Sequence, residues 1–134
     1  MGAITLVIDS ELQNVALMAA AVRGLCAAAA LTKVDIDRLE LGVVEALNNA
    51  IIHAYKDQPG GEIRLLWTQE EDMLRIHISD QGQSMRFPPD GHLPGPEAEN
   101  GRGWFIIQSC VDQLEYGSER GVNTVTLTKR LHHS

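Results

Sequence analysis

Hydrophobic and polar positions along the 134-residue chain recur with two periods, one typical of helices and one typical of strands. A β-rich run, ITLVI at residues 4–8, precedes DSELQ, in which Ser10 and Gln13 form a capping-box pattern. The helix that follows extends to about Leu31, and its apolar positions form one stripe: Val15, Ala19, Val22 and Cys26. A strand is therefore predicted to lead into a helix.

A second helix begins near Thr32 or Asp35, and its apolar positions form a longer stripe at helical spacing: Ile36, Leu39, Val43, Leu47, Ala50 and Ala54. KDQPGGE, residues 56–62, is a turn. Two runs with strand-like alternation follow, and their inward positions are Ile63, Leu65, Trp67, Leu74, Ile76 and Ile78. The turn at residues 69–72 makes these two runs an antiparallel hairpin.

Residues 83–100 contain four of the five prolines and few core residues, which is typical of a functional lid or a mobile loop. GRGWFIIQSCVDQL, residues 101–114, is a helix with Trp104, Ile107, Val111 and Leu114 on one side, and residues 114–131 close the chain as a hairpin with Val125 and Leu127 inward. Helices on one face of a mostly antiparallel sheet predict an α+β two-layer sandwich. The length predicts a single domain over residues 1–134.

Composition excludes several classes of function. Apolar residues make up 44% and charged residues 22% of the chain, as in ordinary globular proteins. The formal charge of −7 and the isoelectric point near 5.1 leave no basic stripe, so nucleic acid is not an expected partner. The first ten residues lack the features of a secretion signal, and the Ala-rich stretch after Val22 is too short to cross a bilayer. A cytoplasmic protein without a membrane partner is expected, with Cys26 and Cys110 as reduced core residues.

Glu45, Asn49 and His53 lie off the apolar stripe and share one side of the second helix. An ordinary solvent-exposed face is the alternative. A pocket wall is favoured because Asn48 and Asn49 are poor helix formers and no Lys or Arg follows Glu45 at i+4. A carboxylate and an amide suit Mg²⁺, which keeps several waters and is held by few protein oxygens together with nucleotide phosphates.

Two glycine-containing segments add further candidates. In SDQGQS, residues 79–84, Asp80 could point into a cavity while Gly82 lets a planar ligand approach the backbone; a strand-terminating turn is the alternative. Gly101 and Gly103 precede a helix whose exposed amides could bind phosphate; a flexible hinge is the alternative. Each segment is a weak signal alone, and their order along the chain is more specific.

Over nearly its full length the chain resembles the ATP-binding domain of the GHKL superfamily, and most closely the small anti-sigma-factor serine kinases of the RsbW type. EALNNAIIHAY at residues 45–55 is similar to their N box, SDQGQS to their first glycine box, and GRGWFII at residues 101–107 to their second. The resemblance implies a Bergerat-type ATP-binding fold, with residues 83–100 as the ATP lid.

The resemblance also implies a role for each motif residue. Asn49 would hold Mg²⁺ against the ATP phosphates, and Glu45 would be the general base for a serine hydroxyl or water. Asp80 would accept a hydrogen bond from the adenine amino group, Gly82 would give room for the ring, and Thr124 would support the adenine end. The other ATP-binding residues would be Gly101, Arg102, Gly103 and Trp104.

Three positions need comment against the family pattern. Trp104 stands where a smaller aliphatic residue is usual, and Asn123 stands before Thr124 where glycine is commoner. Either difference could alter lid closure or the fit of adenine. His53 matches the family's His-Ala-Tyr, and a purely structural role is the alternative for it.

By resemblance, the protein is an ATP-dependent serine/threonine kinase of a partner-switching system, with ATP and Mg²⁺ as cofactors. It would sequester a sigma factor or similar target, phosphorylate a STAS-domain antagonist, and form a homodimer. One alternative is a non-catalytic module in which the bound nucleotide sets the shape of a protein-binding surface. The other is an ATPase or histidine-kinase catalytic domain of a larger system.

Overall fold

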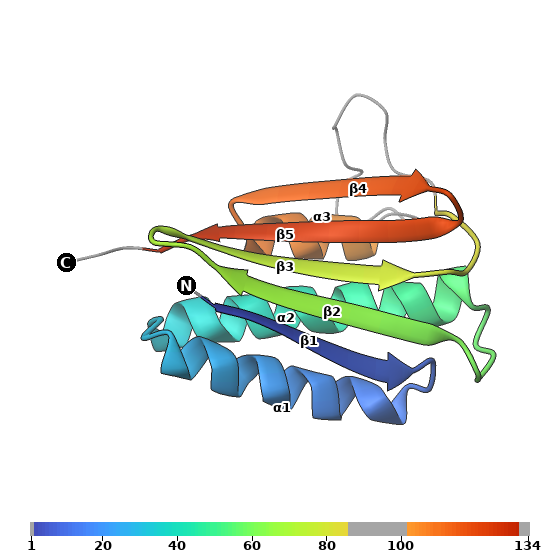
Figure 1. Ribbon diagram of the computed structural model, residues 1–134, viewed down its shortest axis with the longest axis horizontal. Helices are drawn as coiled ribbons and strands as arrows, with labels where there is room; N and C mark the ends of the chain where they lie inside the picture. Colours follow the sequence, from blue (N-terminus) through green and yellow to red (C-terminus); the bar gives the residue numbers. More distant parts are fainter. Residues whose placement is uncertain (1, 86–101, 132–134) are drawn as a thin grey trace.

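The computed structural model describes residues 2–85 and 102–131. In these residues five strands form one antiparallel sheet in the order β1-β2-β3-β5-β4, and helices cover one of its faces (Figure 1). The elements in chain order are β1 (Gly2–Asp9), α1 (Gln13–Ala28), α2 (Lys33–Asn49), η1 (Ala50–Ala54), β2 (Glu62–Gln69), β3 (Met73–Asp80), α3 (Arg102–Cys110), β4 (Gln113–Glu119) and β5 (Val122–Arg130). The predicted α+β two-layer sandwich is confirmed, with the hydrophobic core between sheet and helices.

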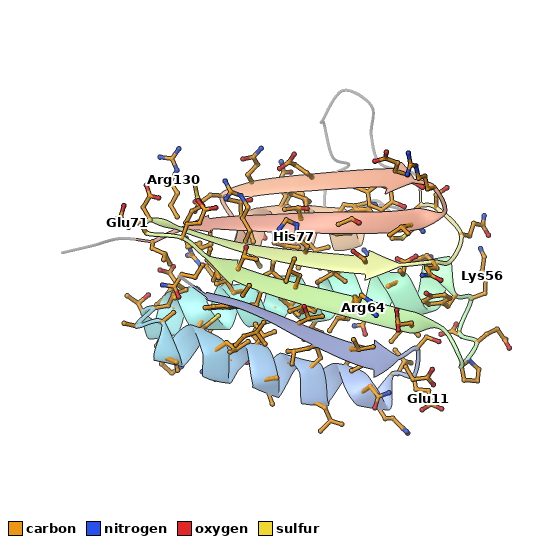
Figure 2. The ribbon with its side chains drawn as sticks, viewed as in Figure 1. Glu11, Lys56, Arg64, Glu71, His77 and Arg130 are labelled. Atoms are coloured by element: carbon orange, nitrogen blue, oxygen red, sulfur yellow. The ribbon has the colours of Figure 1, made fainter. Side chains whose placement is uncertain are left out.

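The register of the strands sorts alternate residues onto the two faces of the sheet. The predicted inward positions are all buried against the helices: Ile63, Leu65, Trp67, Leu74, Ile76, Ile78, Val125 and Leu127. The residues between them face the side that no described helix covers, where Figure 2 shows Arg64 and His77. The sheet thus has one apolar face and one open, largely polar face.

Helix α1 begins differently from its prediction, although its buried stripe is confirmed. Leu12 occupies the N-cap position without a side-chain hydrogen bond, so the predicted capping box is wrong. Ser10 Oγ instead donates to the carbonyl of Gln58 at 2.6 Å and accepts from the amide of Gly61 at 2.9 Å. This hydroxyl joins the β1–α1 connection to the turn before β2, a distant contact that local spacing does not reveal.

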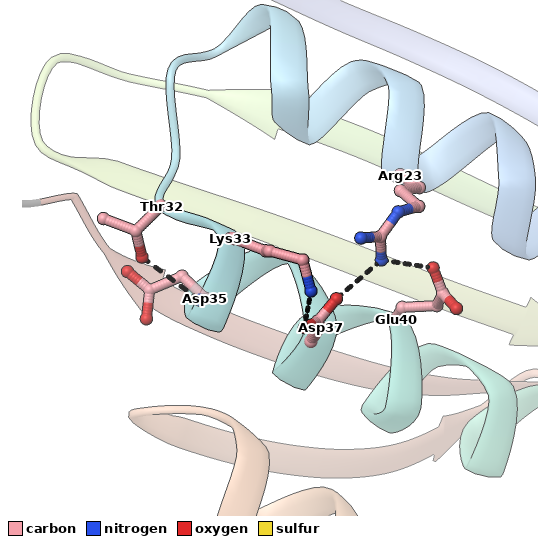
Figure 3. A network of polar contacts seen from close by, with 6 residues as sticks. All are labelled: Arg23, Thr32, Lys33, Asp35, Asp37 and Glu40. Atoms are coloured by element: carbon pink, nitrogen blue, oxygen red, sulfur yellow. Dashed lines mark hydrogen bonds and ion pairs between the residues drawn. The ribbon is translucent and has the colours of Figure 1, made fainter.

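Helix α2 begins at the first of the two predicted starts, just after Thr32. Thr32 caps it, because its Oγ1 accepts a hydrogen bond from the amide three residues later at 3.2 Å. On its exposed side, Arg23 of α1 places Nη1 2.8 Å from Asp37 Oδ1 and 2.9 Å from Glu40 Oε2 (Figure 3). Lys33 adds a contact of 3.0 Å to Asp37 from one turn earlier. Charged pairs therefore join the outer sides of α1 and α2.

Helix α3 ends at Cys110, so the predicted helix through Leu114 is too long. The chain turns there because Asp112 bonds to β5 twice. Its amide donates to the carbonyl of Thr128 at 2.9 Å, and its carboxylate accepts from the amide of Arg130 at 2.6 Å. Leu114 then lies in β4, opposite Leu127 in the register.

The two cysteines are buried and free, as expected from the sequence. Burial raises the pKa of the Cys26 thiol to about 11 and also raises the pKa of Cys110. Both thiols therefore stay protonated at neutral pH and pack as small apolar groups. Among the described helices, none combines the length and the apolar character that a bilayer crossing requires.

Candidate functional site

Two predicted motifs meet where α2 approaches α3. The helices run antiparallel, because Gly42 of α2 packs against Cys110 at the end of α3, while Asn49 packs against Gly103 at its beginning. A side-chain carbon on Gly103 would lie 2.9 Å from Asn49 Oδ1, so glycine permits an approach that other residues would obstruct. Asn49, the predicted Mg²⁺ ligand, therefore lies beside the helix N-terminus that was predicted to bind phosphate.

Glu45 lies one turn before Asn49 on α2, and both side chains are half-buried. Among the described residues, neither side chain has a hydrogen bond or an ion pair. The first turn of α3 contains no acidic residue, so its partial positive charge is not balanced from within the helix. This corner combines a free carboxylate, a free amide and a helix N-terminus, a donor set that suits a metal-bound anion.

A metal ion in this corner would need coordinating oxygens from a bound phosphate and from water in addition to the protein. Residues 2–85 and 102–131 contain no group of three or more His, Cys, Asp or Glu side chains arranged to hold a metal. The amide oxygen of Asn49 lies beside Gly103 in the first turn of α3, and the carboxylate of Glu45 lies one turn earlier on α2. Few protein oxygens completed by water and phosphate are typical of nucleotide-bound Mg²⁺, so the residues fit that ion.

Helix α2 continues past Asn49 as a π-helical turn, η1. The amide of Tyr55 donates to the carbonyl of Ala50, five residues earlier, at 3.0 Å. His53 is exposed on this turn, whereas Glu45 and Asn49 are half-buried. The three residues predicted to share one face therefore have different surroundings, because the wide turn departs from the period of about 3.6 residues.

Turn η1 also holds the end of β3. The carbonyl of Ala54 accepts from the amide of Gln83 at 2.8 Å, and the hydroxyl of Tyr55 accepts from the amide of Gln81 at 2.8 Å. Between these contacts Gly82 packs so closely that any side-chain carbon would collide with the Ala54 carbonyl. Main-chain packing alone thus requires glycine at residue 82, and its predicted room for a ligand ring stays a prediction.

Asp80 ends β3 on the helix-covered face of the sheet and is only 4% exposed. Its Oδ1 accepts from the amide of Gly82 at 3.0 Å and from Nδ2 of Asn123 at 2.7 Å. Among the described residues, Oδ2 receives no hydrogen bond. Burial raises the pKa of the Asp80 carboxyl, and the bonds from Asn123 and Gly82 offset part of that rise. One oxygen therefore remains for a donor group on a ligand.

The structure places Asn123, rather than Thr124, beside Asp80. The register pairs Asp80 with Asn123 and Ser79 with Thr124. Thr124 Oγ1 lies 3.1 Å from Ser79 Oγ, on the open face of the sheet, whereas Asn123 is 2% exposed on the covered face. Thr124 thus lies on the opposite face of the sheet from the Asp80 carboxylate, because successive strand residues point to opposite faces. Its predicted support of the adenine end stays a prediction.

Trp104 is buried in the core at the start of α3. Its indole packs edge-to-face against Tyr116 of β4, with ring centroids 5.3 Å apart and planes at 62°. The hydroxyl of Tyr116 accepts a hydrogen bond from the amide of Met85 at 2.7 Å. This pair of rings therefore holds the first residues of the predicted lid against the sheet, and a contact of Trp104 with nucleotide stays a prediction.

Part of the predicted site lies outside the described residues. This applies to residues 86–100 of the predicted lid, to Gly101, and to the side chain of Arg102. Gly103, a described residue of the second glycine motif, contacts Asn49 of the N box.

A separate groove of about 610 Å³ lies between α1 and α2. Its lining is mainly small and apolar, with polar groups from Arg23, Glu40 and Asn48. Asn48 lines this groove, whereas the next residue, Asn49, faces Gly103. The two consecutive amides therefore belong to different surroundings, and the groove is distinct from the corner at α3.

Comparisons with known proteins show the family to which similar chains belong. A family model described as "Histidine kinase-like ATPase domain" matches residues 8–129. The chain is 31% identical over 134 residues to Serine-protein kinase RsbW of Bacillus velezensis, with 93% of this chain and 83% of that protein covered. It is 31% identical over 132 residues to Serine-protein kinase RsbW of Staphylococcus aureus strain RF122, with 91% and 82% covered.

A solved structure shares the fold. The crystal structure of the RsbU and RsbW domains of a Mycobacterium tuberculosis protein matches with a TM-score of 0.73 at 20% identity. The match covers 98% of this chain and 32% of that chain, so this chain spans about a third of that protein.

Proposed function

Because the chain belongs to the histidine kinase-like ATPase domain family, we propose that it is an ATP-dependent protein serine kinase and an anti-sigma-type regulator of a partner-switching system. Its substrate is a serine of a STAS-domain antagonist, and its sequestered target is a sigma factor or a similar protein. A homodimer in the cytoplasm is part of this proposal. The names of the RsbW relatives support the kinase activity.

The observation that carries the proposal is the packing of Asn49 against Gly103. It brings an amide ligand for Mg²⁺ beside the free amides of a helix N-terminus, which bind phosphate without a basic side chain. ATP supplies the phosphoryl group, and Mg²⁺ balances its charge. Asp80, at the end of β3, accepts a hydrogen bond from the adenine amino group through its free oxygen.

Glu45 is the residue proposed to act on the substrate. Its half-buried carboxylate has no hydrogen bond or ion pair with a described residue, so it is available to accept a proton. It takes the proton of the serine hydroxyl as the serine oxygen bonds to the γ-phosphorus and the bond to the leaving ADP oxygen breaks. Phosphoryl transfer depends mainly on positioning and charge stabilisation, which this corner provides.

The test is intact-mass analysis of candidate STAS-domain proteins after incubation with this protein and Mg-ATP. A gain of one phosphate on one candidate is expected, and this gain should be lost with Glu45→Gln and Asn49→Ala. Matched controls come from the same helix: Glu40→Gln and Asn48→Ala change the same residue types outside the corner. Both controls should retain the transfer.

Nucleotide binding is measured in the same samples. Tight ATP binding with no phosphate gained by any STAS-domain protein of the source genome would contradict the kinase proposal and favour the non-catalytic, nucleotide-gated binding module. Release of free phosphate without transfer to protein would favour an ATPase instead. Absence of ATP binding would contradict the site itself.

A further inference from the structure

The side chain of Asn123 is buried beside Asp80, and two hydrogen bonds hold it there. Its Nδ2 donates to Asp80 Oδ1 at 2.7 Å and to the carbonyl of Gly82 at 3.0 Å. The bond to Asp80 lies wholly in the interior, where a hydrogen bond to a charged group contributes more than one between neutral groups. One amide group therefore satisfies two acceptors on the β3 end.

This bond also distinguishes the two oxygens of the carboxylate. Oδ1 accepts from both Asn123 and Gly82, while Oδ2 accepts from no described residue. A carboxylate that can rotate offers either oxygen to a ligand, whereas one held through Oδ1 offers Oδ2 in a fixed direction. Fixed acceptors discriminate between ligands better than mobile ones, because an unsuitable ligand leaves them unpaired.

We propose that Asn123 is a positioning residue for base recognition, which holds Asp80 so that Oδ2 is the acceptor for an exocyclic amino group of the purine. The inference rests on the proposed function, since it concerns the nucleotide bound at that site. It adds that the selectivity for a 6-aminopurine depends on Asn123, a residue that does not itself have to contact the base.

The test is a thermodynamic cycle between Asn123 and the amino group. Dissociation constants are measured for ATP and for purine riboside triphosphate, which lacks the 6-amino group, with wild type and Asn123→Ala. Wild type should prefer ATP, and Asn123→Ala should reduce that preference about tenfold, the size expected for an interaction with a charged group. A residue that served only folding would weaken both nucleotides equally and leave the ratio unchanged.

A near-isosteric pair protects the test against a variant that fails to fold. Asn123→Thr and Asn123→Val both favour strands and differ in whether a hydrogen-bond donor remains. The threonine variant should keep more of the preference for ATP than the valine variant. The matched control is Thr126→Ala, which removes a side chain from the same strand that lies 3.1 Å from His77 on the open face. The control should retain the wild-type ratio within about twofold.

A second readout needs no nucleotide. The hydrogen bond from Asn123 lowers the pKa of Asp80, so its loss in Asn123→Val should raise that pKa further. The phenols of Tyr55 and Tyr116 also interact electrostatically with Asp80, and both have a raised pKa and are therefore neutral at physiological pH. Carboxyl NMR titration of the nucleotide-free protein measures the shift.

The outcomes separate this inference from the proposed function. If wild type binds ATP and the ratio stays the same in Asn123→Ala and Asn123→Val, the positioning role is wrong while the ATP site stands. If wild type binds neither nucleotide, both the ATP site and base positioning are overturned. An Asp80 titration that does not move in Asn123→Val would overturn the contact itself.

Discussion

The polar side chains at the two ends of helix α2 differ in whether they have hydrogen-bond or ion-pair partners. In the N-terminal half, Thr32 caps the helix, and Asp37 and Glu40 pair with Arg23 of α1 (Figure 3). At the C-terminal end, Glu45 and Asn49 are half-buried and have no hydrogen bond or ion pair among the described residues. The first end uses polar groups to join elements, and the second leaves them available.

The difference distinguishes polar side chains that stabilise the fold from polar side chains that are left for a ligand. A half-buried polar group without a partner costs stability, so a fold gains nothing from it unless a ligand completes it. The α3 N-terminus beside Asn49 supplies a physical reason for leaving these groups unpaired. The position of a polar residue on the helix is therefore less informative than whether its side chain has a partner.

Substitution of the two glutamates should produce the largest contrast. Glu45→Gln is expected to slow phosphoryl transfer about 100-fold or more, the usual contribution of a general base, with little loss of stability. Glu40→Gln should leave the transfer rate unchanged, because its partner is Arg23 rather than a ligand. Single-turnover transfer rates and urea midpoints check this, and equal loss of rate in both variants would break the comparison.

Gly82→Ala should have the next largest effect, a loss of protein stability that arises beside the C-terminal end of helix α2. The added carbon would collide with the Ala54 carbonyl, so the end of β3 must move away from η1. Overpacking of this kind costs about 1–3 kcal/mol. Gly117→Ala is the matched control, because nothing lies within 4 Å of its added carbon. Urea unfolding measures both, and an equally stable Gly82→Ala would contradict the packing role.

Thr32→Ala, at the N-terminal end of helix α2, should lower the free energy of unfolding by about 1 kcal/mol, the typical cost of a lost helix cap. The reason is the amide of Asp35, which loses the Oγ1 acceptor at 3.2 Å. Thr32→Ser keeps a hydroxyl and should retain most of the stability. Phosphoryl transfer should stay normal in both variants. A loss of transfer in Thr32→Ala alone would show that the cap at the N-terminal end of helix α2 affects the site at its C-terminal end.

The smallest effect is expected from the exposed network, as a dependence of stability on pH. Lys33 and then Arg23 hold the pKa of Asp37 below its ordinary value. A lowered pKa stabilises the fold above the ordinary carboxyl range, and this contribution disappears as the pH falls through the lowered pKa. Wild type should therefore lose slightly more stability on acidification than Asp37→Asn. Urea midpoints across the acid range measure the difference, and identical pH profiles would show that the pair contributes nothing.

Local periodicity predicted most of the fold, and contacts between distant segments caused the errors. Strand alternation placed Ile63, Leu74 and Val125 correctly, because each strand buries one face. Ser10 was assigned to a cap that its spacing allows, yet its hydroxyl bonds to Gln58. Leu114 fits the end of a helix as well as an inward strand position, so its period did not reveal where α3 stops.

The placement of the candidate residues could be predicted where it depended on helical spacing, and not where it depended on strand register. Glu45 and Asn49 were found from their position off the apolar stripe. Thr124 was named through the resemblance, and its role stays a prediction; Asn123 was not named as a site residue, although the alternation that places Val125 inward places Asn123 inward too. That signal was present in the sequence. The donor–acceptor pairing with Asp80 appears only once two strands lie side by side.

The π-helical turn at Ala50–Ala54 sets the direction in which the chain leaves helix α2. Such a turn encloses one residue more than an α-helical turn, and removing one residue would rotate all that follows by about 100° around the helix axis. The carbonyl of Ala54 would then point away from Gln83, and Tyr55 away from Gln81. The one additional residue of the π-helical turn thus sets the rotation about the helix axis at which the β2–β3 hairpin contacts helix α2. Deletion of one residue there should leave helix α2 and the hairpin intact and misalign them relative to each other.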